Sequence, residues 1–194
     1  SYYGEYELKT NEEQNDWTDL IDFTYVLNNT PAADFPDTMS EYMDVNSALA
    51  LLAVESLACN LDSYIGRCAN YYMYHRELDD RFVFANWDLN ESWGIFDFWN
   101  MSTTQKQQLS PYWTSPSYGE ERPLAEELWA IPAYDDVYVG HLQRLMAGAA
   151  DPDVLVDRME ELRDVIRPYV YMETSGHRLF TTSQFEAAMT TDIL

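Results

Sequence analysis

The chain has 194 residues, of which 46% are hydrophobic and 15% are aromatic. This amount of buriable surface excludes a disordered chain, and the length suits one domain or one large lobe of a bigger protein. Acidic residues outnumber basic residues by 34 to 11, so the formal net charge is −23. Such a surface repels phosphate backbones and anionic lipids, which argues against nucleic acid or a membrane surface as a partner. No apolar run reaches the length of about 18 residues that a membrane span needs, and no signal peptide is evident.

The N-terminal part of the chain predicts a strand followed by helices. Residues 2–10 alternate tyrosine and leucine with polar residues, which is typical of a half-buried strand. From Asp16 the apolar residues recur at helical spacing, until two prolines within residues 28–36 interrupt the pattern. Asp44 is then a suitable N-cap for a helix rich in alanine and leucine. Because that helix is apolar almost all round, we expect it to lie at the centre of the core.

Residues 70–87 predict a β-hairpin. Aromatic and β-branched residues run up to a charged turn around Leu78 and Asp79 and then return. With the turn at that point, the numbers of paired residues add up to about 157. Asn70 then lies opposite Trp87, and Asp88 follows one step beyond.

The C-terminal part predicts a long loop and then helices. Residues 95–121 are polar and aromatic and contain prolines, which indicates an irregular surface segment. Helices are expected over residues 122–130, 134–147 and 153–169, the last with Asp151 as its cap, and from about Ser183 onward. We therefore expect one compact unit of the α+β class, mostly α, with the short hairpin as its β part.

Three oxygen-bearing side chains are predicted to meet at the open end of this hairpin. Asn70 and Asp88 emerge there together, and Asp62 lies eight residues before Asn70 in the loop after the central helix. Oxygen ligands at this density suit a hard cation such as Mg²⁺ or Mn²⁺. In protein kinases a catalytic-loop Asp precedes a metal-binding Asn, and a metal-binding Asp follows after a hairpin. The order Asp62, Asn70, Asp88 reproduces that arrangement.

The sequence also resembles a known family over nearly its whole length. The segments that carry the resemblance are, in order, "YELKTN", "DWTDLIDF", "LNN", "NLDSY", "NYYMYH" and "FVFANWDLNESWG", followed by "RPLAEELWAIPAYDDVYVGHLQRL" and "FTTSQFEAAM". They are similar to the CotH-type spore-coat kinase family, whose members resemble atypical secreted protein kinases. The Trp-Asp-Leu block and the Asn-Tyr-Tyr strand before it are the specific parts of the match.

The resemblance implies a fold, a reaction and a site. Residues 1–194 would form a single kinase-like C-lobe, with a central apolar helix, a hairpin that carries the metal site, and C-terminal helices. Asp62 would be the catalytic residue, and Asn70 and Asp88 would bind Mg²⁺ or Mn²⁺. The chain would use ATP as its nucleotide and transfer the γ-phosphoryl group to a Ser or Thr of an extracellular or coat protein. Its location would be secreted, or on a cell or spore surface.

Two departures from the family pattern support an alternative. The family usually has Trp-Asp-Leu-Asp, whereas Asn90 is the fourth residue here. A kinase also needs an N-lobe with a phosphate-binding lysine, and neither Lys9 nor Lys106 is an obvious candidate. We therefore expect the N-lobe to be missing from this chain. The alternative function is a non-catalytic kinase-like module that binds protein, or carbohydrate through its exposed aromatic residues.

Several other residues carry weaker expectations. We expect Asp88 to be buried, because it follows a large aromatic residue, and a buried carboxylate has to be paired or bound to a metal. Glu55 lies in the central helix and either contacts the site or forms structural hydrogen bonds. Cys59 and Cys68 either pair across a short loop or stay as two thiols. The histidines lack the spacing of zinc ligands, and a Gly-x-Ser-x-Gly elbow of a serine hydrolase is absent.

Overall fold

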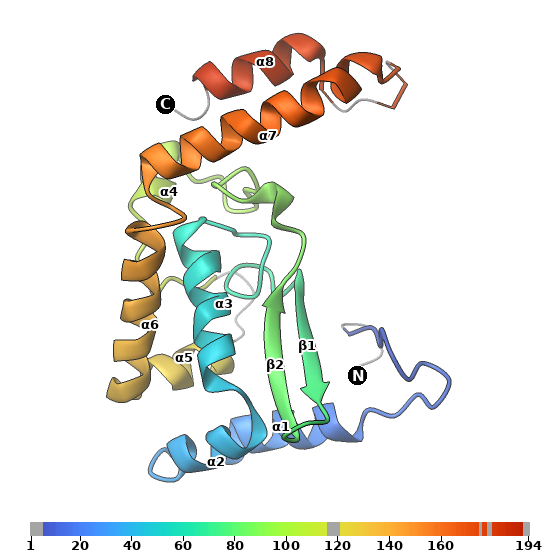
Figure 1. Cartoon of the computed structure of the whole chain (residues 1–194). Helices are drawn as coiled ribbons and strands as arrows, with labels where there is room; N and C mark the ends of the chain where they lie inside the picture. Colours follow the sequence, from blue (N-terminus) through green and yellow to red (C-terminus); the bar gives the residue numbers. More distant parts are fainter. Residues whose placement is uncertain (1–5, 116–120, 175, 178–179, 192–194) are drawn as a thin grey trace. The chain divides into compact units, whose positions relative to one another are not determined.

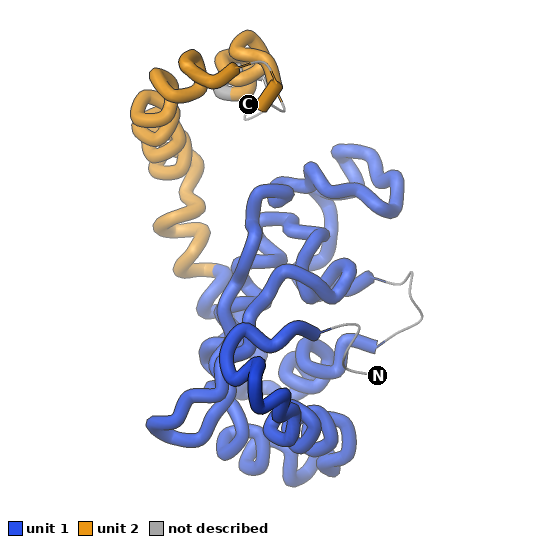
Figure 2. Tube along the Cα trace, turned by 90° about the vertical axis from the view of Figure 1, so that its right-hand side faces the viewer, with its two compact units in different colours: residues 1–142 blue, residues 143–194 orange. Residues whose placement is uncertain are grey.

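The computed structural model of the chain describes residues 6–115, 121–174, 176–177 and 180–191 (Figure 1). The chain divides into two compact units, residues 1–142 and residues 143–194, and not into the one compact unit that the sequence predicted (Figure 2). The described residues are mostly helical and contain a two-stranded antiparallel sheet. The expected α+β class, mostly α, is therefore confirmed, whereas the organisation as a single kinase-like C-lobe stays a prediction. Among the helices described, none combines the length and the hydropathy that crossing a membrane requires.

The elements of the first unit follow one another along the chain, with long loops both before and after the hairpin. They are α1 (Thr18–Asn29), α2 (Phe35–Tyr42), α3 (Val45–Leu57), β1 (Tyr71–Arg76), β2 (Arg81–Asn86), the 3₁₀ turn η2 (Leu89–Glu91), α4 (Thr103–Gln107) and α5 (Pro123–Trp129). Helix α6 (Pro132–Met146) runs from the first unit into the second, which also contains α7 (Pro152–Met172) and α8 (Thr182–Thr191).

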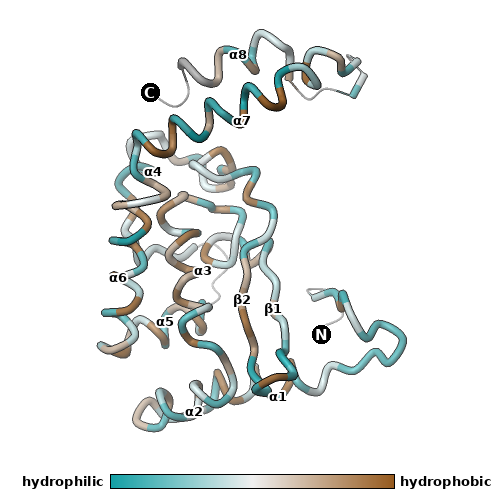
Figure 3. The backbone as a smooth tube through the Cα atoms, viewed as in Figure 1, coloured by the Kyte–Doolittle hydropathy of each residue, from teal (hydrophilic) through white to brown (hydrophobic). Residues whose placement is uncertain are grey.

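Helix α3 lies at the centre of the first unit, as the sequence predicted. Its N-cap is Asp44, whose side chain accepts a hydrogen bond from the backbone N–H of Ser47 at 3.1 Å. Buried residues occur all round the helix, and Leu49 and Leu52 are fully inaccessible to solvent. Helix α3 packs against β2, and the hydrophobic residues along both elements can be followed in Figure 3. The hydrophobic effect thus fixes the hairpin against the central helix.

The hairpin forms with the predicted register. Tyr71 pairs with Asn86 and the ladder runs to Arg76 opposite Arg81, so paired numbers add up to 157. At the open end, the backbone N–H of Trp87 donates to the carbonyl oxygen of Asn70 at 3.1 Å, which confirms that these two residues lie opposite each other.

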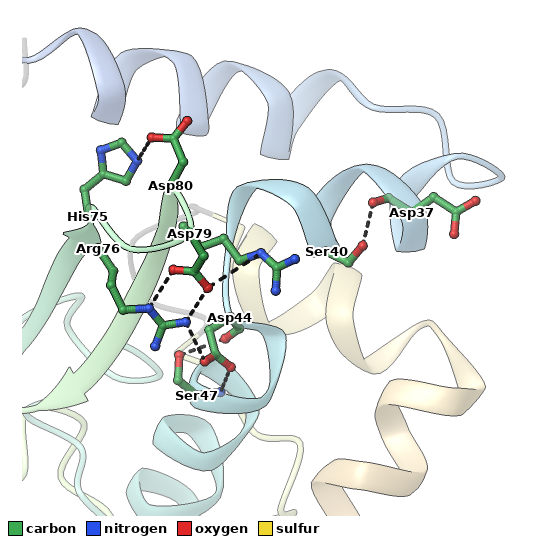
Figure 4. Close-up of polar contacts among 9 residues, drawn as sticks. Asp37, Ser40, Asp44, Ser47, His75, Arg76, Asp79 and Asp80 are labelled. Atoms are coloured by element: carbon green, nitrogen blue, oxygen red, sulfur yellow. Dashed lines mark hydrogen bonds and ion pairs between the residues drawn. The ribbon is translucent and has the colours of Figure 1, made fainter.

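Ion pairs close the other end of the hairpin, at its turn. Two guanidinium nitrogens of Arg76 lie 2.7 and 2.6 Å from the carboxylate oxygens of Asp79, and one of them also lies 3.5 Å from Asp44 (Figure 4). His75 contacts Asp80 with Nε2 and Asp19 with Nδ1, each at 3.1 Å. These contacts join the turn to the N-terminus of α3 and to α1.

The strand predicted for residues 2–10 is wrong over the part that the structure describes. Residues 6–10 have no strand conformation, and residues 1–5 lie outside the described residues. The described part of the chain offers residues 6–10 no β partner, and alternating polarity forms a strand only where a neighbouring strand completes the hydrogen bonds. The segment instead touches the hairpin through side chains, with the hydroxyl oxygens of Tyr6 and Tyr71 3.1 Å apart.

The second unit contains the last two of the predicted helices. Asp151 caps α7 by accepting hydrogen bonds from the backbone N–H groups of Asp153 and Val154, as expected. Helix α7 extends to Met172, three residues beyond its predicted end. The guanidinium of Arg167 on α7 pairs with the carboxylate of Glu186 on α8, with 2.8 Å between Nε and Oε1. This contact helps to join the two helices.

Candidate functional site

Asp62 and Asn70 lie in direct contact at the open end of the hairpin. The side-chain amide nitrogen of Asn70 is 2.8 Å from the carbonyl oxygen of Asp62 and 2.7 Å from its carboxylate oxygen Oδ2. The loop after α3 therefore folds back onto the first residue before β1. The structure brings together two of the three residues that the sequence singled out.

These two contacts determine how the amide of Asn70 is oriented. Both partner atoms on Asp62 are acceptors, so the atom facing them must be the NH₂ group of the amide, which has two N–H donors. The carbonyl oxygen Oδ1 of Asn70 consequently faces away from the Asp62 carboxylate. Among the described residues it accepts no hydrogen bond, so it remains available as an oxygen ligand.

Asp88 lies two residues after the end of β2 and has a left-handed backbone conformation, with φ 52° and ψ 59°. Asn70 also has a positive φ, of 57°. Asn and Asp tolerate this region better than other residues with side chains, and such conformations are common at functional sites. The change in backbone direction at Asp88 ends the strand next to the position of Asn70.

The predicted burial of Asp88 is wrong. Residues 87–90 are all exposed, because the left-handed turn at Asp88 interrupts the alternation that would have carried its side chain toward the core. Among the described residues, the Asp88 carboxylate makes no hydrogen bond or ion pair. Asp88 therefore presents an open carboxylate at the surface, free to bind a ligand.

The carboxylate of Asp62 lies in a more enclosed and charged environment. Its side chain is only 13% exposed, and Arg67 places Nε 3.2 Å from Oδ1. Burial raises the pKa of Asp62, the charge of Arg67 and the hydrogen bond from Asn70 oppose this, and the negative charge of Asp88 raises it further. Asp62 and Asp88 thus lie close enough to interact electrostatically. The net rise in pKa makes Asp62 a better proton acceptor.

Two buried residues, one acidic and one basic, hold the loop that carries Asp62. Glu55 of α3 is fully buried and accepts hydrogen bonds from the backbone N–H groups of Tyr64 and Ile65 at 3.4 and 3.3 Å. Arg122, which precedes α5 and is 1% exposed, donates to the carbonyl oxygens of Tyr64 at 3.2 Å and Gly66 at 2.8 Å. The loop backbone is thereby fixed from both sides.

Sequence reasoning left the role of Glu55 open and did not find Arg122. The structure shows that Glu55 supports the loop through hydrogen bonds. A glutamate within an otherwise apolar helix was a visible signal, since a buried carboxyl needs hydrogen-bond partners. Arg122 gave no comparable signal, because its acceptors are backbone carbonyls 56 and 58 residues earlier in the chain.

An aromatic surface lies beside the candidate site. Trp87 is 55% exposed and directly precedes Asp88, and its ring centroid is 5.0 Å from that of Tyr72 on β1. A large exposed aromatic ring next to oxygen ligands can stack against a planar ligand such as a nucleotide base.

The residues present fit a hard divalent cation. Asp88 supplies an open carboxylate and Asn70 an oriented amide oxygen, whereas Oδ1 of Asp62 is paired with Arg67. Mg²⁺ needs only a few protein oxygens, because it keeps several of its waters. No group of three or more His, Cys, Asp or Glu residues within the described chain could hold a metal ion, so an all-charged metal cluster is not found there. The candidate ligands are instead the carboxylate of Asp88 and the amide oxygen of Asn70, with Asp62 beside them.

A surface hollow lies elsewhere, at the turn end of the hairpin. Its volume is about 690 Å³, and its lining includes Asp16, Asp19, Asp22, His75 and Asp80. His75 and Asp80 belong to the closed end of the ribbon, whereas Asn70 and Asp88 lie at the open end. We therefore place the candidate chemistry at the open end, where the oxygen ligands and the hydrogen-bonded Asp62 are found.

Cys59 and Cys68 are not joined by a disulfide.

The fold and the site define an α+β protein with an oxygen-rich polar site at the end of a β-hairpin. A family model described as CotH kinase protein matches residues 1–191, so the chain belongs to the CotH kinase family. The chain is also 30% identical over 89 residues to the inner spore coat protein H of Bacillus subtilis (strain 168). That alignment covers 46% of this chain and 24% of the relative, so the chain spans about a quarter of the relative's length.

Proposed function

We propose that this chain carries the catalytic site of a CotH-type protein kinase. The reaction would transfer the γ-phosphoryl group of ATP to a Ser or Thr hydroxyl of another protein. The observation that supports this most directly is the amide of Asn70, which donates to Asp62 while its own oxygen accepts no hydrogen bond from the described residues. Membership of the CotH kinase family supports the same reaction.

Asp62 would orient and deprotonate the attacking hydroxyl. The hydroxyl oxygen forms a bond to the γ-phosphorus, and the bond from this phosphorus to the bridging oxygen breaks. ADP leaves with the electron pair, and the proton of the hydroxyl passes to Asp62. The raised pKa of Asp62 suits this proton transfer, and its hydrogen bond from Asn70 keeps the carboxylate in one orientation.

Asn70 and Asp88 would hold the divalent cation, either Mg²⁺ or Mn²⁺. When bound, such a cation neutralises negative charge on the nucleotide phosphates. The protein itself supplies little positive charge for neutralising the phosphates, because acidic residues outnumber basic residues and the net charge is −23. The exposed ring of Trp87, next to Asp88, would stack against the nucleotide base.

The acceptor would be a coat or extracellular protein, and the chain itself would be secreted or located at a cell or spore surface. This part of the proposal is supported by the relative in Bacillus subtilis, whose name places it in the inner spore coat.

The test is calorimetric titration of the chain with ATP in the presence of Mn²⁺, compared with Asp88→Ala. The unaltered chain is expected to bind, and Asp88→Ala is expected to lose binding and phosphoryl transfer while it keeps its fold by circular dichroism. Asp136→Ala on α6 is the matched control, because it removes an exposed aspartate with the same change in charge. Asp88→Ala with binding like that of the unaltered chain would contradict the assignment. A chain that binds no nucleotide would favour the non-catalytic interaction module.

A further inference from the structure

Arg67 is held beside the candidate site by two contacts. Its Nε lies 3.2 Å from Oδ1 of Asp62, and its Cζ lies 5.7 Å from the ring centroid of Phe96. The side chain is nevertheless 49% exposed. An ion pair at one edge and an aromatic ring against the face restrict the guanidinium without covering it.

The guanidinium of Arg67 has donors that the protein does not use. An arginine side chain carries five N–H donors, of which only the one on Nε lies near Asp62. Within the described part of the chain, Nη1 and Nη2 of Arg67 form no hydrogen bond or ion pair. These two nitrogens therefore remain available to an anion that approaches Asp62.

The other Lys and Arg side chains of the first unit have partners other than the carboxylate of Asp62. Their partners are Glu7 for Lys9, Asp79 and Asp44 for Arg76, Asp79 for Arg81, Asp97 for Lys106, and backbone carbonyls for Arg122. Arg67 is thus the cation that the described residues place next to Asp62.

We propose that Arg67 binds the terminal phosphoryl group of the nucleotide through Nη1 and Nη2, an inference that rests on the proposed kinase function. A hydroxyl held by Asp62 lies about 2.7 Å from the carboxylate, and the phosphorus it attacks lies about 3–3.5 Å beyond. The guanidinium starts 3.2 Å from the same carboxylate, so its outer nitrogens reach the oxygens of that phosphoryl group. Arginine is well suited to this task, because its planar fork matches two phosphate oxygens at once.

The local charge explains why such a residue is needed. Asp62 and Asp88 interact electrostatically, and the chain as a whole is strongly acidic. A triphosphate entering this field is repelled, and each further phosphate increases the repulsion. Arg67 offsets this repulsion at the phosphate nearest to Asp62. Its effect should therefore be large for the third phosphate and small for the first two.

The test compares two nucleotides on the same protein. Calorimetry with Mn²⁺ measures the affinity for the β,γ-imido analogue of ATP, which is not hydrolysed, and for ADP. We expect Arg67→Gln to weaken binding of the ATP analogue about tenfold to a hundredfold, the range for a lost hydrogen bond to a charged group. ADP binding should change less than about threefold on the same scale. Arg67→Lys should be intermediate, and Arg158→Gln, which removes an exposed arginine of α7, should leave both affinities unchanged.

A second comparison separates direct contact from an effect through Asp62. In the background of Asp62→Asn, Arg67→Gln should still weaken binding of the ATP analogue, because the phosphate contact does not need the Asp62 charge. Equal losses for the two nucleotides, or no loss for either, would overturn the role of Arg67 while the kinase proposal stands. Disappearance of the effect in the Asp62→Asn background would overturn it as well. Failure of the unaltered chain to bind either nucleotide would overturn the proposed function, and this inference with it.

Discussion

Replacing Glu55 with glutamine tests how the protein holds the loop that carries Asp62. Glu55 is fully buried in α3, and its carboxyl group faces the backbone N–H groups of Tyr64 and Ile65. Burial raises the pKa of Glu55 to about 8, even though the hydrogen bonds from Ile65, Ser63 and Tyr64 act in the opposite direction. Near neutral pH the folded chain therefore keeps this carboxyl group mostly protonated.

The raised pKa makes the folded state bind more protons than the unfolded chain between pH 4.5 and about 8. The free energy of unfolding must then fall as the pH rises through this range, and the contribution of Glu55 is fully present only below pH 4.5. A tenfold change in proton affinity is worth about 1.4 kcal/mol. The shift of the Glu55 pKa from 4.5 to about 8 therefore changes the free energy of unfolding by roughly 5 kcal/mol across this pH range. A difference of several kcal/mol in the free energy of unfolding between the two ends of this pH range should therefore be measurable.

Glu55→Gln has no proton to lose, so it should lack this part of the pH dependence. Its NH₂ group would face a backbone N–H, which costs about 1–3 kcal/mol at low pH. We therefore expect Glu55→Gln to be less stable than the unaltered chain at pH 5 and to become equal or more stable by pH 9.

Urea unfolding followed by tryptophan fluorescence from pH 5 to pH 9 measures this difference. Other titrating groups contribute to both proteins and cancel when the two are subtracted. Glu41→Gln on α2 is the matched control, because that glutamate is exposed. A difference between Glu55→Gln and the unaltered chain that stays constant across the pH range would refute the reasoning.

Two further predictions concern the loop and the aromatic surface. A Cβ atom on Gly66 would lie 1.8 Å from the carbonyl oxygen of Leu61, so Gly66→Ala should destabilise the chain by about 1–3 kcal/mol or more and weaken nucleotide binding. Gly176→Ala is its control, since no atom lies within 4 Å of a Cβ there, and unchanged urea unfolding of Gly66→Ala would contradict the prediction. The exposed ring of Trp87 would stack on the nucleotide base. Trp87→Ala should therefore weaken the binding of ATP and of ADP to a similar extent, by about 1–3 kcal/mol in calorimetry. A loss confined to one of the two nucleotides would exclude that role.

The local features of the fold were accessible from the sequence. Asp44 was a recognisable N-cap, and the apolar helix behind it was correctly expected at the centre of the core. The hairpin register followed from the position of its turn, because antiparallel pairing has no freedom once the turn is fixed. That register already placed Asn70 opposite Trp87. Each of these features depends on residues that are close together in the chain.

The chemistry of the site depended on features that only the tertiary structure decided. The orientation of the Asn70 amide comes from its two contacts with Asp62, and the exposure of Asp88 comes from a left-handed backbone conformation. Neither has a periodic signal in the sequence. The same is true of residues 6–10, whose alternation predicted a strand although the described chain offers them no β partner.

The support of the loop that carries Asp62 is the clearest example of a feature that only the tertiary structure decided. Glu55 and Arg122 are 67 positions apart in the numbering, yet both bind the backbone of the same short loop. Backbone N–H and C=O groups are identical at every residue, so no sequence pattern reveals which of them a distant side chain will satisfy. By itself, the sequence determined which residues could carry the chemistry. The packing of α3 and α5 around the loop decided how Asp62 is held, and with it which side chains, Arg67 among them, lie beside its carboxylate.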